Sequence, residues 1–528
     1  MGAVGAPAPR LDEAGAATGR RGIVFVGFMG AGKSTAAGLA ARALGEPALD
    51  TDRLLEQELG ETIESFFDRE GEAAFRACEE ELVLRVLARP DASVVAFGGG
   101  ALGSERVRAA LRKHVVVWLD VGAAEAWRRV AGGERPLARD REGFGCLHSE
   151  RRAVYAAAAD AVVPTEGPPE AVLAALPALG ALREQLSDAG GPLRLVWARS
   201  ASTDYPVFFG RGALGRGVFH PVGGRRFVVA DERVAALHAL PGDWSVPVPA
   251  GETEKTLTRA EEVLRAMARA GVSRDDLVVA FGGGVVGDLA GFCAAVYQRG
   301  VRCVQVPTTL VAQVDSAYGG KTGVDLPEAK NYVGAYHQPA AVLVDPDVLA
   351  TLPREEVAAG YAEVVKTALI AGGELWERVR SGANPTDEEV ILGCLSTKLA
   401  VVAEDERDEG RRQVLNLGHT VGHALEAATG YRRLRHGEAV AIGMLCALRL
   451  SGQGALREEV AGLFSLQGLP AHVDGVTVDE MVALVARDKK RRGGSVPFVL
   501  VAGPGAVSPG HLVAEADLRA AVAEVVGG

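Results

Sequence analysis

The stretch Gly27-Phe28-Met29-Gly30-Ala31-Gly32-Lys33-Ser34-Thr35 follows the apolar run Ile23–Val26 and precedes an alanine-rich segment. Glycines at this spacing let backbone N–H groups turn toward phosphate oxygens, where the N-terminus of the next helix also favours anions. The pattern between a strand and a helix is a P-loop. It predicts a nucleoside triphosphate site in an α/β fold, in which Lys33 reaches the β- and γ-phosphates and Ser34 binds Mg²⁺.

Outward from this loop, short β-rich runs alternate with longer helical segments. The expected strands are residues 23–26, 48–49, 94–97, 115–119 and 161–163. This alternation predicts a doubly wound parallel sheet over residues 21–186, closed by a helix at 168–186. Residues 187–192, Ser-Asp-Ala-Gly-Gly-Pro, predict a linker, and the Ala/Gly/Pro-rich residues 1–20 predict a disordered tail.

A second α/β rhythm begins at residue 193. Its expected strands are residues 195–198, 207–209, 227–230, 277–281, 303–306 and 341–344. After residue 352 helical patterns dominate, with one late β-like run at 496–501. The pattern predicts a nucleotide-binding α/β subdomain over 193–352 and a mostly helical metal- and substrate-binding subdomain over 353–528.

Composition limits the classes of function. The 528 residues carry a net charge of −11, which disfavours nucleic acid and anionic membranes as partners. Six scattered cysteines form no CxxC pair and indicate reduced thiols of a cytoplasmic protein. No apolar run is long enough to span a bilayer, and the N-terminus lacks the apolar core of a signal peptide. We therefore expect small-molecule substrates.

A second glycine loop, Gly282-Gly283-Gly284-Val285-Val286-Gly287-Asp288, follows the expected strand 277–281. It fits a dinucleotide fingerprint, but the usual acidic residue about twenty positions on is replaced by Val306-Pro307-Thr308-Thr309. Asp231 stands upstream instead, after residues 227–230. We expect a nucleotide fold that differs from an ordinary Rossmann unit. Gly98-x-Gly100-x-x-Gly103 fits the same fingerprint and is interpreted as a substrate loop.

Four side chains suit a catalytic metal. His419 and His423 share one face of a helix, His436 follows beyond a turn, and Glu363 lies upstream. One carboxylate and two imidazoles leave a position open on Zn²⁺, whereas Co²⁺ or Fe²⁺ fit the same ligand types. Basic and amide side chains nearby predict a phosphorylated acid as substrate: Lys321, Lys330, Asn331, Lys366, Lys398, Arg412, Asn416, Lys489 and Lys490.

Residues 22–186 resemble shikimate kinase through the P-loop, Asp50-Thr51-Asp52, Phe75-Arg76, Gly98-Gly99-Gly100 and Arg135-Pro136-Leu137. The resemblance implies that Asp50 and Ser34 hold Mg²⁺ and that Asp52 orients the attacking hydroxyl. ATP is implied to contact Gly30, Gly32, Lys33, Ser34, Thr35 and Arg135, the last also stabilising the transferred phosphoryl group. Shikimate is implied to contact Asp52, Arg76, Gly98, Gly99, Gly100 and Arg151.

The family pattern Arg-x-Pro-Leu-Tyr reads Arg151-Arg152-Ala153-Val154-Tyr155 in this chain. The proline is missing and a second arginine adjoins the first. The choice between Arg151 and Arg152 as the substrate contact therefore stays open.

Residues 193–528 resemble 3-dehydroquinate synthase. The matching motifs include Gly251-Glu252-x-x-Lys255, Gly282–Asp288, Gln298-Arg299-Gly300, Gln313-Val314-Asp315-Ser316, Asn416-x-Gly418-His419-Thr420-x-Gly422-His423 and His436-Gly437-Glu438. The resemblance implies Zn²⁺ on Glu363, His419 and His436, with His423, Lys321 and Arg299 as catalytic residues. Since Arg299 in the family reaches the site of a neighbouring subunit, it also implies a homodimer through this half.

The implied NAD⁺ contacts are Asp231, Glu252, Lys255, Gly283, Gly284, Val285, Asp288, Thr308, Thr309, Lys321, Lys330 and Asn331. The implied substrate contacts are Asp315, Lys321, Lys330, Asn331, Lys366, Lys398, Arg412, Asn416, His423 and Lys490, with Lys489 as the alternative to Lys490.

Together the two resemblances predict a bifunctional enzyme of aromatic biosynthesis. One half phosphorylates shikimate with ATP, and the other converts 3-deoxy-D-arabino-heptulosonate 7-phosphate into 3-dehydroquinate and phosphate. Two alternatives remain open at this point. The second half could be a related sugar-phosphate cyclase, or one half could be a non-catalytic scaffold.

Overall fold

The computed structural model describes residues 22–131, 140–167, 170–186, 193–216, 222–486 and 496–527. The chain forms two compact units, one of residues 1–160 with 165–173 and one of 161–164 with 174–528. The expected tail at 1–20 and linker at 187–192 lie outside the described residues, so the domain limits stay a prediction.

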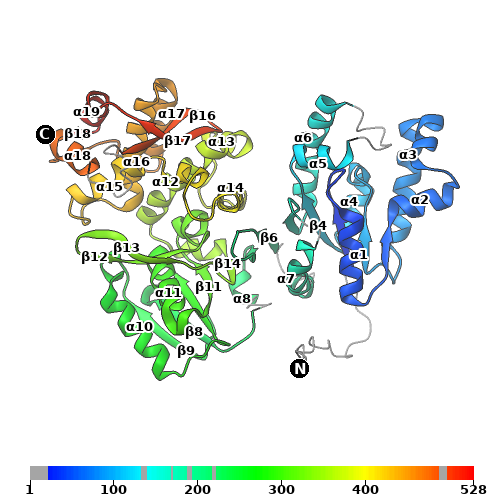
Figure 1. The fold of residues 1–528 in the computed structure, drawn as a ribbon, viewed down its shortest axis with the longest axis horizontal. Coiled ribbons are helices and arrows are strands. Elements are labelled where there is room, and N and C mark those ends of the chain that lie inside the picture. The colour runs from blue at the N-terminus through cyan, green and yellow to red at the C-terminus, as the bar shows by residue number, and fades with distance from the viewer. Residues whose placement is uncertain are drawn as a thin grey trace, which may run out of the picture. The chain divides into compact units, whose positions relative to one another are not determined.

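The first unit is built on a parallel sheet with the strand order β2 (Ala48–Asp50), β3 (Val94–Ala96), β1 (Ile23–Val26) and β4 (Val115–Asp120). Its central strands are buried on both faces, as parallel strands are when helices cover them. The helices are α1 (Lys33–Leu44), α2 (Thr51–Leu59), α3 (Ile63–Leu87), α4 (Glu105–Leu111), α5 (Ala123–Val130) and α6 (Arg141–Ala158) (Figure 1). The parallel sheet expected for this half is confirmed, but the strand expected at 161–163 is grouped with the second unit.

The second unit contains a larger, mostly parallel sheet. Its strand order is β5 (Ala161–Pro164), β6 (Arg194–Ala198), β7 (Tyr205–Phe209), β14 (Ala341–Val344), β11 (Arg302–Pro307), β10 (Leu277–Gly282), β8 (Arg226–Asp231) and β9 (Trp244–Val248). Only the β6–β7 pair among these strands is antiparallel. The expected strands are present. Strand β9 was not expected, because its Trp-Ser-Val-Pro-Val sequence contains a proline, which suits this position at the sheet edge.

Helices accompany this sheet and continue beyond it. They are α7 (Ala171–Gln185), α8 (Ala213–Arg216), α9 (Glu232–Leu237), α10 (Leu257–Arg269) and α11 (Gly284–Val296). The later ones are α12 (Arg354–Ala371), α13 (Gly373–Arg380), α14 (Glu388–Glu404), α15 (His419–Ala428), α16 (His436–Leu450), α17 (Gly454–Leu466), α18 (Val478–Val485) and α19 (Glu515–Ala523). The helix expected at 168–186 is α7.

Three short two-stranded sheets complete this unit. One pairs β15 (Val473–Asp474) with β18 (Val526–Gly527), and another pairs β16 (Pro497–Gly503) with β17 (Ala506–Leu512). The hairpin of β12 (Lys321–Leu326) and β13 (Ala329–Tyr336) lies between the larger sheet and the helices α12–α16 (Figure 1). Its polar, glycine-containing sequence lacks a clear period of two, so it was not expected as strands.

Glycines allow the helices α12, α15 and α16 to approach one another closely. A Cβ atom at Gly437 would lie 1.9 Å from the Ala359 carbonyl oxygen, and one at Gly443 would lie 2.0 Å from the Gly418 carbonyl oxygen. A Cβ at Gly422 would meet the Ala439 carbonyl oxygen at 3.2 Å. The backbones therefore touch where the side chains of His419 and His436 begin.

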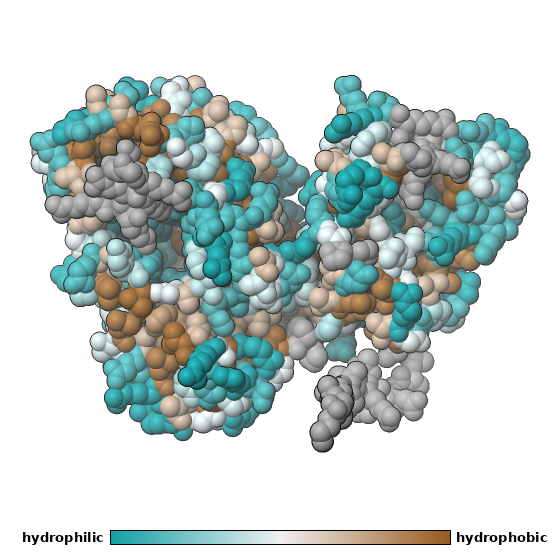
Figure 2. All heavy atoms as spheres, viewed as in Figure 1, coloured by the Kyte–Doolittle hydropathy of each residue, from teal (hydrophilic) through white to brown (hydrophobic). Residues whose placement is uncertain are grey.

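On the face shown in Figure 2 most of the described surface is hydrophilic, and apolar residues gather in several small patches. Leu466 and Leu512, each 73% exposed, belong to different elements. None of the helices in the described ranges has the length and apolar content needed to cross a bilayer.

The close contact at Gly437 gives a stability test. Replacing Gly437 by alanine forces α16 away from α12, and overpacking of this kind lowers the free energy of unfolding by about 1–3 kcal/mol. Urea unfolding followed by circular dichroism measures the loss. Gly462 in α17 is the matched control, because a Cβ there meets no atom within 4 Å. Gly462→Ala is expected to be neutral or stabilising by about 0.5–1 kcal/mol. Equal effects of the two substitutions on the free energy of unfolding would contradict the close contact between α12 and α16 at Gly437.

Candidate functional sites

The P-loop connects β1 to α1 and depends on glycine at several positions. Gly27, Gly30 and Gly32 have φ angles of 147°, 80° and 85°, a region that other residues rarely adopt. A Cβ at Gly27 would lie 2.6 Å from the Leu119 carbonyl oxygen. Lys33 Nζ donates a hydrogen bond to the Phe28 carbonyl at 3.1 Å, so the loop curls around its own lysine.

Arg129, which no motif pointed to, supports this loop from α5. Its Nη1 donates to the Gly30 carbonyl at 3.1 Å and its Nη2 to the Thr165 carbonyl at 2.7 Å, while Nε pairs with Glu125 at 2.7 Å. The guanidinium thus fixes the position of one loop carbonyl. Arg135 lies outside the described residues.

The acidic residues after β2 lie at the same sheet edge as the P-loop, because carboxyl ends of parallel strands meet there. Asp50 Oδ1 caps α2 by accepting the backbone N–H groups of Asp52 and Arg53 at 3.1 and 3.2 Å. A Cβ at Gly98 would lie 2.4 Å from Asp52 Oδ1 and 2.6 Å from Glu79 Oε1. The glycine turn after β3 therefore lies directly against two carboxylates.

Arg76, Arg151 and Arg152 are the arginines considered as shikimate contacts, and the first two face this glycine turn. Arg76 Nη1 donates to Glu79 Oε2 at 2.6 Å, and a Cβ at Gly100 would lie 2.1 Å from the same Nη1. Arg151 Nη1 donates to the Gly99 carbonyl at 3.1 Å, which also accepts the Tyr155 hydroxyl at 2.5 Å.

Arg152 instead forms a two-pronged ion pair with Asp120 at 2.6 and 2.7 Å and stacks over Trp118. This geometry favours Arg151 over Arg152 as the residue that faces a substrate. The assignment of Arg151 as the substrate contact stays a prediction.

Glu79 was missed by the sequence patterns. Its carboxylate is buried, and burial raises its pKa while Arg76 works in the opposite direction. The only signal in the sequence was that Glu79 stands three residues after Arg76 on a helix. This spacing does not single it out, because Glu80 and Glu81 follow directly in the run Cys78-Glu79-Glu80-Glu81.

The second glycine loop joins β10 to the N-terminus of α11. Thr308 N–H donates to the Gly282 carbonyl at 2.9 Å, and a Cβ at Gly283 would lie 2.8 Å from Thr309 Cγ2. Thr308 Oγ1 is buried and has no hydrogen-bond partner within the described residues. An unpaired buried hydroxyl beside a helix N-terminus fits a phosphate-bearing nucleotide.

Asp231 ends β8, the strand next to β10, and caps α9 through its Oδ1. The adjacency explains why the acidic residue stands upstream of the loop in sequence but beside it in space.

Lys255 is buried among three carboxylates: Glu252 at 3.0 Å, Asp288 at 3.3 Å and Asp325 at 3.9 Å. Burial lowers the pKa of Lys255, but the carboxylates outweigh it and raise the pKa above its ordinary value. Burial raises the pKa of Asp288 to about 6 despite the attraction of Lys255. This network fixes the residues around the glycine loop.

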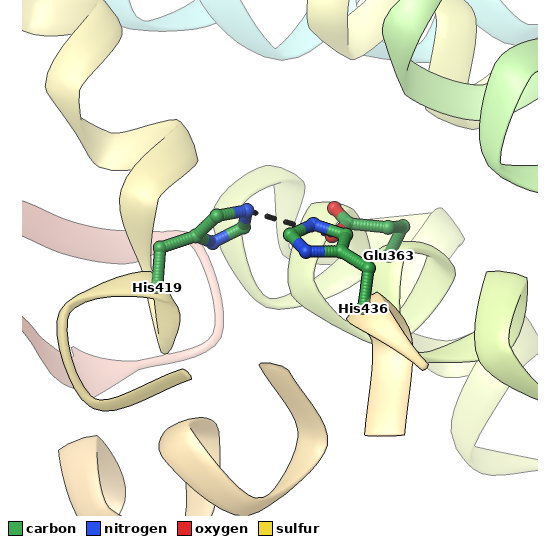
Figure 3. Close-up of side chains that lie close together, drawn as sticks. All are labelled: Glu363, His419 and His436. Carbon is green, nitrogen blue, oxygen red and sulfur yellow. Dashed lines mark ion pairs between the residues drawn. The ribbon is translucent and has the colours of Figure 1, made fainter. Parts of the chain in front are cut away.

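The metal candidates converge from three helices (Figure 3). Glu363 on α12 is 0% exposed, and its Oε1 lies 3.6 Å from His419 Nε2 and 3.5 Å from His436 Nε2. His419 Nδ1 lies 3.1 Å from the Leu417 carbonyl, which leaves Nε2 for a ligand. Neither carboxylate oxygen of Glu363 makes a hydrogen bond within the described part of the chain, although Lys366 forms an ion pair with it. One oxygen and two nitrogens within 4.8 Å of one another fit Zn²⁺.

The electrostatics of Glu363 agree with an anionic ligand. Burial alone would raise the pKa of its carboxyl group, but Lys366 and the two imidazoles hold it well below the ordinary value. His423 lies close to both other histidines, with ring centroids 5.3 Å from His419 and 6.1 Å from His436.

Basic side chains continue from the metal cluster. Lys366 and Lys398 both pair with Asp315, which lies on a π-helical turn of residues 312–316, an irregularity common at functional sites. Burial lowers the pKa of Lys398 to about 8, although Asp315 partly opposes this. Lys321 pairs with Asp408 at 2.5 Å, a partner that no motif indicated.

The remaining candidates differ in accessibility. Arg412 is 1% exposed and donates to the Gly319 and Glu406 carbonyls, so part of its guanidinium is used inside the fold. Asn416 Nδ2 donates to the Gln413 carbonyl at 3.1 Å. Asn331 adopts a positive φ of 53° with its N–H bound to Asp325. Arg299 is exposed and has a φ of 66°. Lys489 and Lys490 lie outside the described residues.

Comparisons with known proteins agree with both sites. A shikimate kinase family model matches residues 29–178, and models of the N-terminal and C-terminal parts of 3-dehydroquinate synthase match residues 245–359 and 360–491. A 3-dehydroquinate synthase of Halorhodospira halophila is 44% identical over 345 residues, which cover 61% of this chain and 98% of that protein. One of Paracoccus denitrificans is 42% identical over 354 residues, covering 61% and 96%.

Solved structures are similar to the same region. A 2-epi-5-epi-valiolone synthase of Streptomyces hygroscopicus with NAD⁺ and Zn²⁺ bound is 29% identical, with a TM-score of 0.57, covering 61% of this chain and 96% of that one. A 2-deoxy-scyllo-inosose synthase complexed with carbaglucose-6-phosphate, NAD⁺ and Co²⁺ is 25% identical, with a TM-score of 0.55, covering 63% and 99%.

Proposed function

This chain belongs to the 3-dehydroquinate synthase family and carries a shikimate kinase domain, and we propose that its two sites catalyse two steps of aromatic biosynthesis. The first site phosphorylates shikimate with ATP. The second converts 3-deoxy-D-arabino-heptulosonate 7-phosphate into 3-dehydroquinate and phosphate. The observation that carries the second assignment is the convergence of Glu363, His419 and His436. This cluster is linked to the nucleotide loop, because Lys366 pairs with both Glu363 and Asp315, and a Cβ at Gly284 would lie 3.1 Å from Ser316 Oγ.

In the kinase half, the P-loop N–H groups and Lys33 bind the ATP phosphates, and Ser34 with Asp50 holds Mg²⁺. Asp52 accepts hydroxyl groups of shikimate at the turn of Gly98. The guanidinium groups of Arg76 and Arg151 flank this turn and suit a carboxylate bound through two parallel hydrogen bonds. Arg135 is assigned to the transferred phosphoryl group by family resemblance alone.

In the synthase half, we assign the α/β part over 193–352 to nucleotide binding and the helical part over 353–528 to metal and substrate. Bound NAD⁺ and Zn²⁺ supply a hydride acceptor and a Lewis acid. Glu363, His419 and His436 hold the metal, and Thr308, Gly283 and Asp231 hold the nucleotide. Lys366 and Lys398, both anchored on Asp315, attract the anionic substrate and retain its phosphate until it leaves. We assign proton exchange with bound substrate to His423, whose ring lies near both ligand imidazoles.

The related sugar-phosphate cyclases are the alternative for this half. The two curated relatives named above, both 3-dehydroquinate synthases, are 42% and 44% identical, whereas the two solved cyclases of other specificity are 25% and 29% identical. The adjoining shikimate kinase domain also favours a shikimate-pathway product. Identification of the product by NMR distinguishes the two hypotheses, a 3-dehydroquinate synthase and a related sugar-phosphate cyclase.

Separate inactivation of the two sites tests the assignment of both halves. Lys33→Met is expected to abolish ATP-dependent phosphorylation of shikimate and to leave phosphate release from the heptulosonate unchanged. Lys366→Met is expected to do the reverse, because it removes a buried cation between Glu363 and Asp315. Coupled assays for ADP and for phosphate measure the two activities. A Lys33→Met chain that still phosphorylates shikimate contradicts the kinase assignment, and the matched wild-type chain controls for folding.

The pKa of Lys398 predicts the alkaline limb of the synthase reaction. Because its folded pKa is about 8 rather than the ordinary 10.5, the charged form is lost as the pH rises through 8. The kcat/KM for the phosphorylated substrate is therefore expected to fall above pH 8. The same shift makes the charged state unfavourable for folding, so its contribution to stability improves between pH 8 and 10.5. Lys398→Arg, which stays protonated, should shift the fall in kcat/KM to higher pH. An unchanged pH profile excludes Lys398 as the source of this fall.

We also propose that the synthase half works as a homodimer in which Arg299 serves the neighbouring site. Its exposure and its left-handed backbone support this role, since a strained exposed turn is common in functional segments. Arg299→Ala and Lys366→Met chains, each inactive, are expected to regain synthase activity when mixed and refolded together. A mixed dimer then contains one site with both side chains intact. Failure of the mixture to regain activity contradicts the shared site.

A further inference from the structure

Glu426 is a buried acidic residue on α15 that neither the motifs nor the family resemblance singled out. It is 2% exposed, yet its Oε1 lies 3.5 Å from His436 Nδ1 and accepts a hydrogen bond from Lys330 Nζ at 3.0 Å. The other ring nitrogen of His436, Nε2, faces Glu363 at 3.5 Å. The imidazole of His436 is therefore held between two buried carboxylates.

The two ligand histidines are oriented by different groups. His419 Nδ1 faces a neutral backbone carbonyl, that of Leu417, at 3.1 Å, whereas His436 Nδ1 faces the Glu426 carboxylate. An acceptor at Nδ1 fixes the ring orientation and keeps the proton there, so the Nε2 lone pair points toward the metal position. His436 is the first residue of α16 and its side chain is 39% exposed, so packing restrains it less than it restrains His419.

Glu426 is also linked by ion pairs to the nucleotide cradle, which we define as Glu252, Lys255 and the glycine loop Gly282–Asp288. Lys330 on β13 lies 3.0 Å from Glu426 and 3.5 Å from Glu252, and Glu252 pairs with Lys255, which pairs with Asp288 of the glycine loop. Charges of alternating sign thus run without a gap from the metal cluster to the nucleotide loop. Each lysine in this line lies between two carboxylates, Lys330 between Glu426 and Glu252 and Lys255 between Glu252 and Asp288, which explains how these charges are accommodated.

We infer that Glu426 is a positioning residue that orients His436 for metal binding and, through Lys330, connects that orientation to the nucleotide cradle. The inference rests on the proposed metal-dependent function of the same site. Glu426 and Glu363 face different ring nitrogens of His436, so the imidazole separates Glu426 from the cluster of Glu363, His419 and His436.

Metal affinity of the full chain tests this role independently of catalysis. Competition with a chromogenic chelator measures Zn²⁺ affinity, and Glu426→Gln is expected to weaken it by about 10- to 100-fold. Glu438→Gln is the matched control. Glu438 lies on the same helix two residues after His436, but its carboxylate bonds to Arg435 instead. Its substitution is expected to leave the affinity unchanged.

Two further readouts separate positioning from a general structural effect. The visible spectrum of the Co²⁺-loaded chain should change in Glu426→Gln but stay the same in Glu438→Gln, because only the former alters ligand geometry. The thermal transition of the chelator-treated Glu426→Gln chain should match that of the chelator-treated wild type. Glu426→Asp, which keeps the charge at a longer distance, should lose less affinity than Glu426→Gln and provides the test if the amide variant does not fold.

Equal Zn²⁺ affinities and equal Co²⁺ spectra in the wild type and Glu426→Gln overturn the inference alone. A second bound metal equivalent that disappears in Glu426→Gln overturns it too, since it would make Glu426 a ligand together with His423 and His436. A wild-type chain with no Zn²⁺ affinity overturns the proposed function and this inference with it.

Discussion

The buried carboxylate of Glu363 is the constraint on which the second half of the structure depends. A fully buried anion is very unfavourable unless cations or a metal surround it, and here Lys366 and two imidazoles do so. These groups come from three helices, whose backbones must touch to bring short side chains together. The glycines at 418, 422, 437 and 443 permit this contact. These glycines carry no functional group, but they are therefore as necessary to the site as its ligand side chains.

Both halves apply one geometric rule. In a parallel sheet the carboxyl ends of the strands share an edge, so loops distant in sequence meet there. In the first unit this brings together the P-loop after β1, Asp52 after β2 and the glycine turn after β3. In the second unit it brings together Asp231 after β8, the glycine loop after β10 and Thr308 after β11. Each site is then completed by side chains from helices outside the sheet.

The features that could be predicted from sequence were those with a fixed local spacing. The P-loop, the strands flanking it, and the metal set of Glu363, His419 and His436 each follow from such a pattern or from the family motifs that contain it. Glu79 and Glu426 could not be predicted, because an acidic residue on a helix usually belongs to a solvated face. In the structure Glu79 lies against the glycine turn at 98–100, and Glu426 accepts a hydrogen bond from Lys330 on an unexpected hairpin. The choice of Arg151 over Arg152 likewise required the ion pair with Asp120.

The residues of the two sites come from separate stretches of the chain. The described groups of the kinase site lie between Gly27 and Thr165, and those of the synthase site lie between Asp231 and His436. Since 3-dehydroquinate is not the substrate that the kinase phosphorylates, the fusion gains nothing from passing an intermediate directly between sites. What covalent linkage does guarantee is equal amounts of the two activities. The physical argument for the fusion is therefore one of stoichiometry.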